Sequence, residues 1–255
     1  MKSLDIALMA AAGNVTATNP NAWDLSKFQP ASNPSSAWDI STAEFGTNHT
    51  GSFSTYPRGM VFKPDGTKLY VTGSYSDNVK EYSLPHPWST LDSSLDYTLS
   101  VSAQEAQASA LFFKPDGTKF FLIGFNSDSI HEYDLSTAWD LSTASFNNNE
   151  FSVSSQEINP EGLFFKTDGT KMYVVGTTGD DVNEYDLSTA WDVTSATYSQ
   201  NFSVSGQDTA PRGVHFKSDG TKMYIVGDAG NDINEYDLST AWDVSTASYN
   251  QNFSV

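Results

Sequence analysis

The sequence predicts an all-β protein, a β-propeller built from four complete repeats of about 51 residues, each forming a four-stranded blade, with a partial repeat before them. Three observations predict this fold: a tetrapeptide that recurs at nearly constant spacing, short strand-like segments between turn signals, and the lack of sustained helical periodicity. Because the partial repeat either builds a further blade or is left over, the sequence allows four or five blades.

The recurring tetrapeptide is Asp-Gly-Thr-Lys, and its copies lie 51 or 52 residues apart. The copies are Asp65–Lys68, Asp116–Lys119, Asp168–Lys171 and Asp219–Lys222. Each is followed by a Glu-Tyr pair and by a tryptophan that lies 22 residues after the glycine in all four copies. A type I turn followed by a glycine with positive φ closes a short hairpin, so we expect each tetrapeptide to join the first two strands of a blade.

The segments between these markers predict strands, because β-branched and aromatic residues dominate them and turn residues bound them. In the last repeat, four strands are expected around Gly213–Phe216, Met223–Val226, Ile233–Leu238 and Ser245–Val255. The Trp-Asp pair then falls in the turn between the third and fourth strands. A four-stranded antiparallel unit of this length, repeated in tandem, is typical of a propeller blade.

The residues also carry a family resemblance. The segment Phe62–Gly73 and its later copies resemble the YVTN-type repeats of bacterial and phage β-propellers, over about residues 33–255. The resemblance implies the propeller fold. It implies no single activity, because such propellers host unrelated functions and the residues used by their lactonase-like members do not map onto this chain.

Composition excludes several classes of function. The net charge of −18 and the pI near 4.3 disfavour a phosphate-binding surface, so no nucleic-acid partner is expected. No cysteine is present, which excludes disulfides and thiolate metal sites. No apolar run approaches the ~18 residues that a membrane span needs, so no membrane insertion is expected.

The chain divides into an N-terminal arm or anchor segment, residues 1–36, and the propeller domain, residues 37–255. Residues 37–54 match the outer strand of a further blade, which either belongs to an irregular fifth blade or pairs with a neighbouring subunit. Met1–Gly13 resembles the start of many small structural proteins of tailed phages. The apolar run Ile6–Ala12 is also compatible with a signal peptide, although Asp5 interrupts the pattern.

The two ends of each blade differ in sequence. The repeat rim, formed by the Asp-Gly-Thr-Lys turns and the Trp-Asp turns, is nearly identical between copies. The divergent rim, formed by the loops between the second and third strands and between consecutive repeats, varies. Because recognition concentrates on variable loops held by a rigid scaffold, we predict ligand or partner binding on the divergent rim. The candidate residues are Tyr56, Arg58, Tyr75, Asp77, Glu105, Phe125, Asp128, Glu157, Glu161, Asp180, Asp181, Asp208, Arg212, Asp228 and Asp232.

The candidates permit more than one interpretation. The loop carboxylates offer oxygen ligands for calcium, but their pattern favours solvated turn residues, and no metal or cofactor is predicted. The aromatic side chains either stack on a sugar or partner or pack between blades. Arg58, Glu161 and Arg212 occupy equivalent positions before the first strand's glycine, with Ser109 as the fourth, and either bind an anionic group or pair with each other.

Catalysis is not predicted, because the four histidines occupy four different repeat positions and no Ser-His-Asp set is recognisable. The sequence therefore favours a non-catalytic binding or assembly module, a structural or host-recognition protein of a phage virion. Its expected partners are other virion or structural proteins through residues 1–36, or a cell-surface glycan, and a homo-oligomer in a virion or outside the cell is expected. The alternatives are a propeller hydrolase of lactonase type and a secreted carbohydrate-binding propeller.

Overall fold

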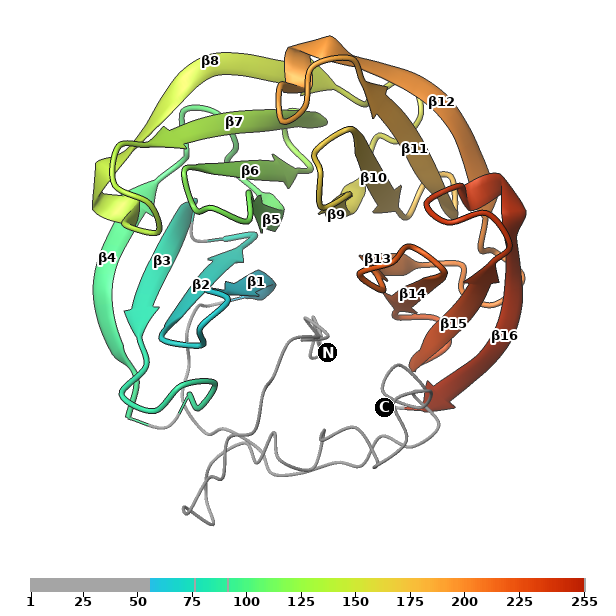
Figure 1. The fold of residues 1–255 in the computed structure, drawn as a ribbon, viewed down its shortest axis with the longest axis horizontal. Helices are drawn as coiled ribbons and strands as arrows, with labels where there is room; N and C mark the ends of the chain where they lie inside the picture. The colour runs from blue at the N-terminus through green and yellow to red at the C-terminus, as the bar shows by residue number, and fades with distance from the viewer. Residues whose placement is uncertain (1–55, 76, 91, 255) are drawn as a thin grey trace.

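The computed structural model describes residues 56–75, 77–90 and 92–254, and it shows four four-stranded antiparallel sheets arranged as the blades of a propeller (Figure 1). The predicted all-β fold is confirmed. The N-terminal arm, residues 1–36, and the partial repeat, residues 37–54, lie outside the described residues. Among the described residues, no helix has the length and apolar character needed to cross a membrane.

Each blade follows the chain from the centre of the ring to its edge. The first blade consists of β1 (Pro57–Phe62), β2 (Lys68–Gly73), β3 (Asn78–Ser83) and β4 (Ser94–Ser100). The second consists of β5 (Ala108–Phe113), β6 (Lys119–Gly124), β7 (Ser129–Leu135) and β8 (Ala144–Ser152). The third consists of β9 (Pro160–Phe165), β10 (Lys171–Gly176), β11 (Asp181–Leu187) and β12 (Ala196–Ser203). The fourth consists of β13 (Pro211–Phe216), β14 (Lys222–Gly227), β15 (Asp232–Leu238) and β16 (Ala247–Ser254).

Three single turns of 3₁₀ helix precede the outer strands of the later blades: η4 (Leu141–Thr143), η5 (Val193–Ser195) and η6 (Val244–Thr246). Each begins after the aspartate of a Trp-Asp pair, whose side chain accepts a hydrogen bond from the backbone two residues on, as Asp140 does from the Ser142 N–H. This is N-capping by a short acidic side chain. The Trp-Asp pair therefore lies between the third and fourth strands, as predicted.

The Asp-Gly-Thr-Lys turns have the predicted backbone. Gly117 has a φ of 74°, and a Cβ atom built on it would lie 2.2 Å from the ring of Trp139. Only glycine combines a left-handed backbone with such close approach to an indole. The same pairing of turn glycine and tryptophan recurs in all four blades, which explains the fixed distance of 22 residues between them in the sequence.

The hydrophobic core lies between neighbouring blades rather than inside one sheet. The buried cluster that contains Tyr70 and Val79 of the first blade continues into Leu111 and Phe120 of the second. Contacts between inner strands join β1 to β5, β5 to β9 and β9 to β13. Burial of these faces removes apolar surface from water. Each Å² of buried apolar surface contributes about 25 cal/mol to stability, and this makes blade stacking favourable.

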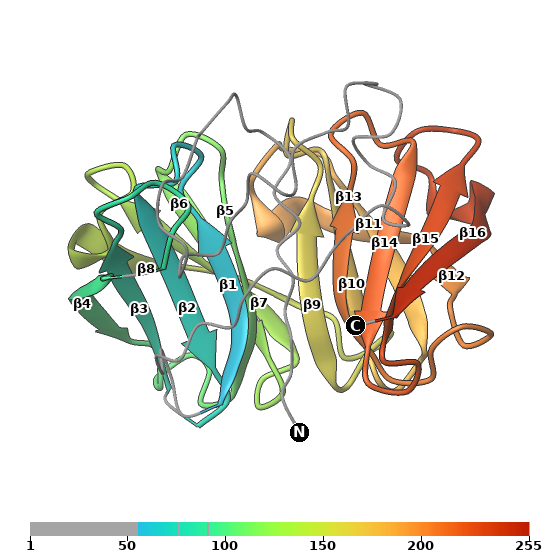
Figure 2. The same ribbon diagram turned by 90° about the horizontal axis from the view of Figure 1, so that it is seen from below.

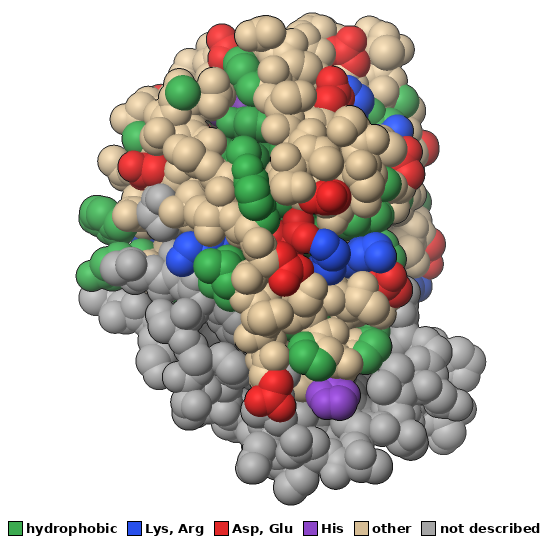
Figure 3. Space-filling view, turned by 90° about the vertical axis from the view of Figure 1, so that its left-hand side faces the viewer, with side chains coloured by type: hydrophobic (Ala, Val, Ile, Leu, Met, Phe, Trp, Pro, Cys, Tyr) green, Lys and Arg blue, Asp and Glu red, His purple; other side chains and the backbone are tan. Residues whose placement is uncertain are grey.

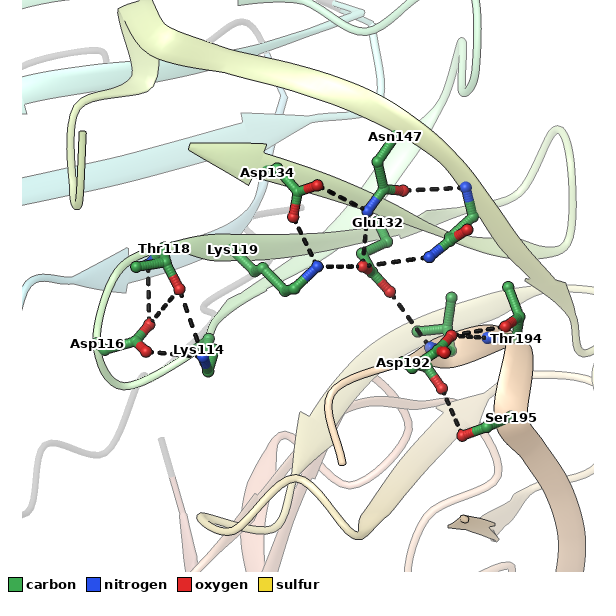
Figure 4. Close-up of polar contacts among 12 residues, drawn as sticks. Lys114, Asp116, Thr118, Lys119, Glu132, Asp134, Asn147, Asp192, Thr194 and Ser195 are labelled. Carbon is green, nitrogen blue, oxygen red and sulfur yellow. Dashed lines mark hydrogen bonds and ion pairs between the residues drawn. The ribbon is translucent and has the colours of Figure 1, made fainter. Parts of the chain in front are cut away.

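Buried glutamates near the repeat rim join neighbouring blades, and Figure 4 shows the one between the second and third blades. The Glu132 carboxylate in β7 accepts a hydrogen bond from the Lys119 ammonium at 2.5 Å and another from the backbone N–H of Val193 in the following blade at 3.3 Å. Lys119 also pairs with Asp134 at 2.6 Å. The recurrent glutamates thus pair with the hairpin lysines and in addition connect blades.

Candidate functional site

Four residues at equivalent positions surround the mouth of the central channel on the divergent rim. They are Arg58 in β1, Ser109 in β5, Glu161 in β9 and Arg212 in β13. The register of each inner strand shifts at this point, which marks a β-bulge. A bulge re-aims a side chain relative to the regular pleat. All four line one cavity of 540 Å³.

The inner strands approach closely because small residues follow the four positions. A Cβ atom built on Gly59 would lie 2.9 Å from the Cα atom of Ala110, and one on Gly162 would lie 2.9 Å from the carbonyl oxygen of Arg212. Side chains at these points would force the blades apart. The glycines therefore bring the four mouth residues within reach of one another.

Glu161 stands between the two arginines, which come from the first and fourth blades. Its carboxylate lies 3.2 Å from Nη1 of Arg58 and also forms an ion pair with Nη1 of Arg212. The Glu161 side chain is 4% exposed, whereas each arginine side chain is 24% exposed. A buried carboxylate requires such compensation, because its desolvation costs several kcal/mol.

Loops of the divergent rim orient the two arginines. Nε and Nη2 of Arg212 donate to the Asp228 carboxylate at 3.0 and 2.9 Å. Nε of Arg58 donates to Ser74 Oγ at 3.4 Å, and its guanidinium lies 5.3 Å from the centre of the Phe125 ring, a cation–π contact. The structure thus brings together five of the predicted residues: Arg58, Phe125, Glu161, Arg212 and Asp228.

The channel wall below the mouth is largely apolar and includes Val61, Phe112 and Phe164. His215 lines the same cavity, and its ring meets that of Phe164 edge to face at 5.0 Å between centroids. Desolvation by burial lowers the pKa of His215 to about 4, so its imidazole is uncharged at neutral pH. In the sequence, His215 stands out only as one of four histidines at different repeat positions. Its register position, which alternates with core-facing residues, was the signal for a channel-lining side chain.

Three predicted loop carboxylates are buried and organise the divergent rim from inside. Glu105 and Glu157 are 0% exposed, and Asp208 is 1% exposed. The Glu157 carboxylate accepts hydrogen bonds from the backbone N–H groups of Asn159 at 2.7 Å and Gly179 at 3.1 Å. These carboxylates satisfy loop N–H groups that would otherwise be buried without acceptors. The sequence placed them on an accessible surface, and the structure corrects that placement.

Two further predicted aspartates lie inside the sheets. Asp181 and Asp232 are each 8% exposed, and each accepts from an asparagine of its own strand, Asn183 at 2.6 Å and Asn234 at 2.7 Å. Desolvation raises the pKa of Asp181. Their interactions stabilise the sheet, and they lie apart from the channel mouth.

The remaining predicted residues lie on the loops. Asp77, Asp128 and Asp180 adopt positive φ angles of 46°, 48° and 50°, which turn aspartates tolerate. Desolvation and the nearby charges of Glu105 and Glu157 raise the pKa of Asp128. Tyr56 and Tyr75 are 57% and 71% exposed, and their rings lie 4.9 Å apart between centroids. Whether these residues bind a ligand stays a prediction.

One Ser-His-acid arrangement, which the sequence analysis did not recognise, lies in the second blade. Ser127 Oγ is 2.9 Å from Nε2 of His131, whose Nδ1 is 3.5 Å from the Glu150 carboxylate. The Glu105 carboxylate competes for the same hydroxyl at 2.8 Å and also accepts from the backbone N–H groups of residues 126 and 127. Those N–H groups are thus not available as an oxyanion hole, and the arrangement serves loop structure.

Several solved structures share this fold. No protein-family model matches the chain, and neither does any curated protein sequence. A functionally unknown protein from Desulfotomaculum acetoxidans is 14% identical with a TM-score of 0.54, over 80% of this chain and 58% of that one. The periplasmic gluconolactonase PpgL from Pseudomonas aeruginosa is 15% identical with a TM-score of 0.52, over 78% and 57%. A candidate 6-phosphogluconolactonase from Bacteroides uniformis is 14% identical with a TM-score of 0.51, over 78% and 55%.

The likeness is one of fold. The chain spans just over half the length of each of these proteins. The prediction that the protein is not an enzyme is corrected, because proteins named as lactonases share this propeller. The lack of a recognisable catalytic triad in the sequence was not a sufficient reason to exclude catalysis, since hydrolysis needs only a positioned base and charge stabilisation. None of the three comparisons supports a role in a phage virion.

Proposed function

We propose that the channel mouth is the active site of a propeller hydrolase that opens lactones of sugar acids. The observation that carries the proposal is the Glu161 carboxylate held between Arg58 and Arg212 at the entrance of a 540 Å³ cavity. A cavity of this size accommodates a small sugar derivative.

The three charged groups match the chemistry of ester hydrolysis. Glu161 takes a proton from a water molecule as the water oxygen attacks the lactone carbonyl carbon. The carbonyl oxygen gains negative charge, which Arg58 and Arg212 stabilise. The ring C–O bond then breaks, and its oxygen receives the proton, so one water molecule is consumed and one open-chain hydroxy acid is formed.

The surroundings of the cluster support a sugar-acid substrate. Glu161 and Asp228 balance the charges of Arg58 and Arg212, and the arginine N–H groups at the mouth offer hydrogen-bond donors to the carboxylate or hydroxyl oxygens of a sugar acid. Tyr56 and Tyr75 present exposed rings on the same rim as Arg58, and flat aromatic faces are common in binding surfaces. The presence of lactonases among the proteins of this fold supports the same reaction class.

The test is lactone hydrolysis by the full chain, followed with a pH indicator after subtraction of spontaneous hydrolysis. Gluconolactone, its 6-phosphate and a non-sugar γ-lactone serve as substrates. Glu161→Gln keeps the shape of the side chain and is expected to lower kcat by about 10²-fold or more, the usual contribution of a general base. Lys63→Gln on the repeat rim is the control, because Lys63 pairs only with the exposed Asp65 among the described residues.

Two results would refute the proposal. One is the absence of catalysed hydrolysis for all three lactones, and binding of a sugar acid without turnover would then favour the carbohydrate-binding alternative. The other is hydrolysis that Glu161→Gln leaves unchanged. Thermal unfolding of each variant shows whether a loss of activity comes from a loss of folded protein.

A further inference from the structure

Two of the three interfaces between described blades share a tyrosine contact to the Trp-Asp turn of the following blade, and the second blade has Phe121 at the equivalent position. The Tyr70 hydroxyl in β2 donates to the carbonyl oxygen of Trp139 at 2.6 Å, and the Tyr173 hydroxyl in β10 donates to that of Trp242 at 2.7 Å. Each tyrosine thus contacts the backbone of a tryptophan 69 residues later in the chain.

A buried glutamate makes the second contact of each interface. The accepting carboxylates and donating backbone N–H groups are Glu81 with Leu141 at 2.7 Å, Glu132 with Val193 at 3.3 Å and Glu184 with Val244 at 3.0 Å. The donor is always the second residue after the tryptophan. Figure 4 shows this contact between the second and third blades.

A glutamine adds a third contact between the third and fourth blades. Nε2 of Gln200 donates to the Asp243 carboxylate at 2.7 Å and to Glu184 at 3.0 Å. Tyrosine, glutamate and glutamine lie side by side in the sheet, because Tyr173 pairs with Glu184 and Glu184 with Gln200 in the strand register. The three side chains together recognise the carbonyl, the aspartate and the N–H of one Trp-Asp turn.

The fourth blade presents the same three side chains in the same register. Tyr224 pairs with Glu235, and Glu235 pairs with Gln251. In a ring, this face meets the Trp-Asp turn of whichever blade follows the fourth. In Figures 1 and 2, the first blade with β1 and the fourth blade with β13 lie on either side of the interval that the described blades leave open in the ring.

The chain contains a matching sequence before the first blade. Trp38-Asp39-Ile40-Ser41-Thr42-Ala43 reproduces the sequence pattern of residues 242–247, with a hydroxyl residue where Thr246 donates to the Asp243 carbonyl oxygen at 2.8 Å and an alanine where Ala247 ends η6. The second candidate, Trp23-Asp24-Leu25-Ser26-Lys27-Phe28, departs from the pattern at its last two positions.

We propose that residues 38–43 of the same chain dock on the face formed by Tyr224, Glu235 and Gln251 and so connect the fourth blade to the first. Tyr224 donates to the Trp38 carbonyl oxygen, Glu235 accepts from the Ile40 N–H, and Gln251 donates to the Asp39 carboxylate. The chain between Ala43 and β1 at Pro57 reaches about 40 Å when extended, which is ample for this path.

A double-mutant cycle tests the predicted contact between Asp39 and Gln251 in the full chain. Asp39→Lys and Gln251→Glu are each expected to lower Tm, and the two together to restore about 2–4 °C of the summed loss, because opposite charges then face each other. The pair Gln200→Glu with Asp243→Lys, whose contact is described at 2.7 Å, is the positive control. Asp24→Lys with Gln251→Glu is the negative control.

Hydrogen exchange and light scattering give a second measurement that does not depend on variants. Amides of residues 40–42 are expected to exchange as slowly as those of 141–143, and the chain to be monomeric at the concentrations used. The proposal is overturned if Asp24 rather than Asp39 couples to Gln251, if neither couples while the positive control does, or if residues 40–42 exchange freely. Coupling that appears only in a dimer would assign the docked turn to a second copy of the chain and would also overturn it.

Discussion

The two rims of the propeller hold their loops by different means. On the repeat rim, every blade uses the same exposed lysine-aspartate pair, the same glycine against tryptophan and the same buried glutamate. On the divergent rim, buried carboxylates hold the loops through backbone N–H groups, and the side chains that remain differ from blade to blade. Backbone recognition leaves loop side chains free to vary, whereas side-chain recognition fixes them.

The side of the ring seen in Figure 3 shows acidic and basic side chains lying against each other. Such exposed pairs contribute little individually, typically 0–1 kcal/mol. The buried members of the repeat rim are therefore expected to supply most of its stability.

The largest effect is expected for Glu184→Ala on the repeat rim. The change leaves Lys171 without its 2.5 Å partner and the Val244 N–H of the next blade without its acceptor. Lys171 keeps its ion pair with Asp186 at 2.6 Å, so the cost comes from the two lost hydrogen bonds to a charged group, at about 1.5–3 kcal/mol each, or about 3–5 kcal/mol in unfolding free energy. Urea unfolding measures the loss. Glu150→Ala is the control, because that side chain is 62% exposed, and equal losses for the two variants would contradict the role of burial.

Gly169→Ala on the same rim is expected to cost about 2–4 kcal/mol, from a disfavoured left-handed backbone and a clash. Gly169 has a φ of 75°, and a Cβ atom there would lie 2.4 Å from Trp191. Gly206→Ala is the matched control, since a Cβ atom at Gly206 meets nothing within 4 Å. Thermal unfolding compares the two. A similar Tm for both variants would show that the tryptophan does not constrain the turn.

The repeat rim was predictable from the sequence, and much of the divergent rim was not. Turn glycines and tryptophans are local or regularly spaced, so the repeat itself reveals their packing. Glu161, in contrast, meets an arginine 103 residues away, and that contact depends on the curvature of the ring and on a bulge in each inner strand. Glu157 resembled a solvated loop carboxylate, because sequence does not show which backbone N–H groups a folded loop buries.

His215→Phe tests whether the channel wall below the divergent rim is protected from water. The pKa of His215 is lowered to about 4 by desolvation, against 6.5 in an unfolded chain. The unfolded chain therefore binds a proton first, and wild-type stability falls as the pH drops from 6.5 to 4, by on the order of 3 kcal/mol.

The variant removes that dependence, and phenylalanine fits because Phe112 and Phe164 occupy the equivalent position in two other blades. Urea unfolding between pH 7 and pH 4 gives the two profiles. Asp65 in a turn of the repeat rim titrates at lower pH. Desolvation acts to raise the pKa of Asp65, but hydrogen bonds from Lys63 and Thr67 outweigh it and hold that pKa at about 2. Parallel profiles for wild type and variant over this range would mean that water reaches His215.

The smallest change in stability is expected for Tyr75→Ala on the divergent rim. Tyr75 is 71% exposed, and its one ring contact among the described residues is with Tyr56. Substitutions of exposed side chains usually change the unfolding free energy by no more than about 0.5 kcal/mol, so Tm is expected to shift by about 2 °C or less. If the ring contacts the sugar portion of a lactone, KM rises while kcat stays near the wild-type value, because a phenol ring that only contacts the sugar does not take part in proton transfer. A large drop in Tm would show instead that the divergent rim is built from its side chains, as the repeat rim is, and the contrast between the two rims would no longer hold.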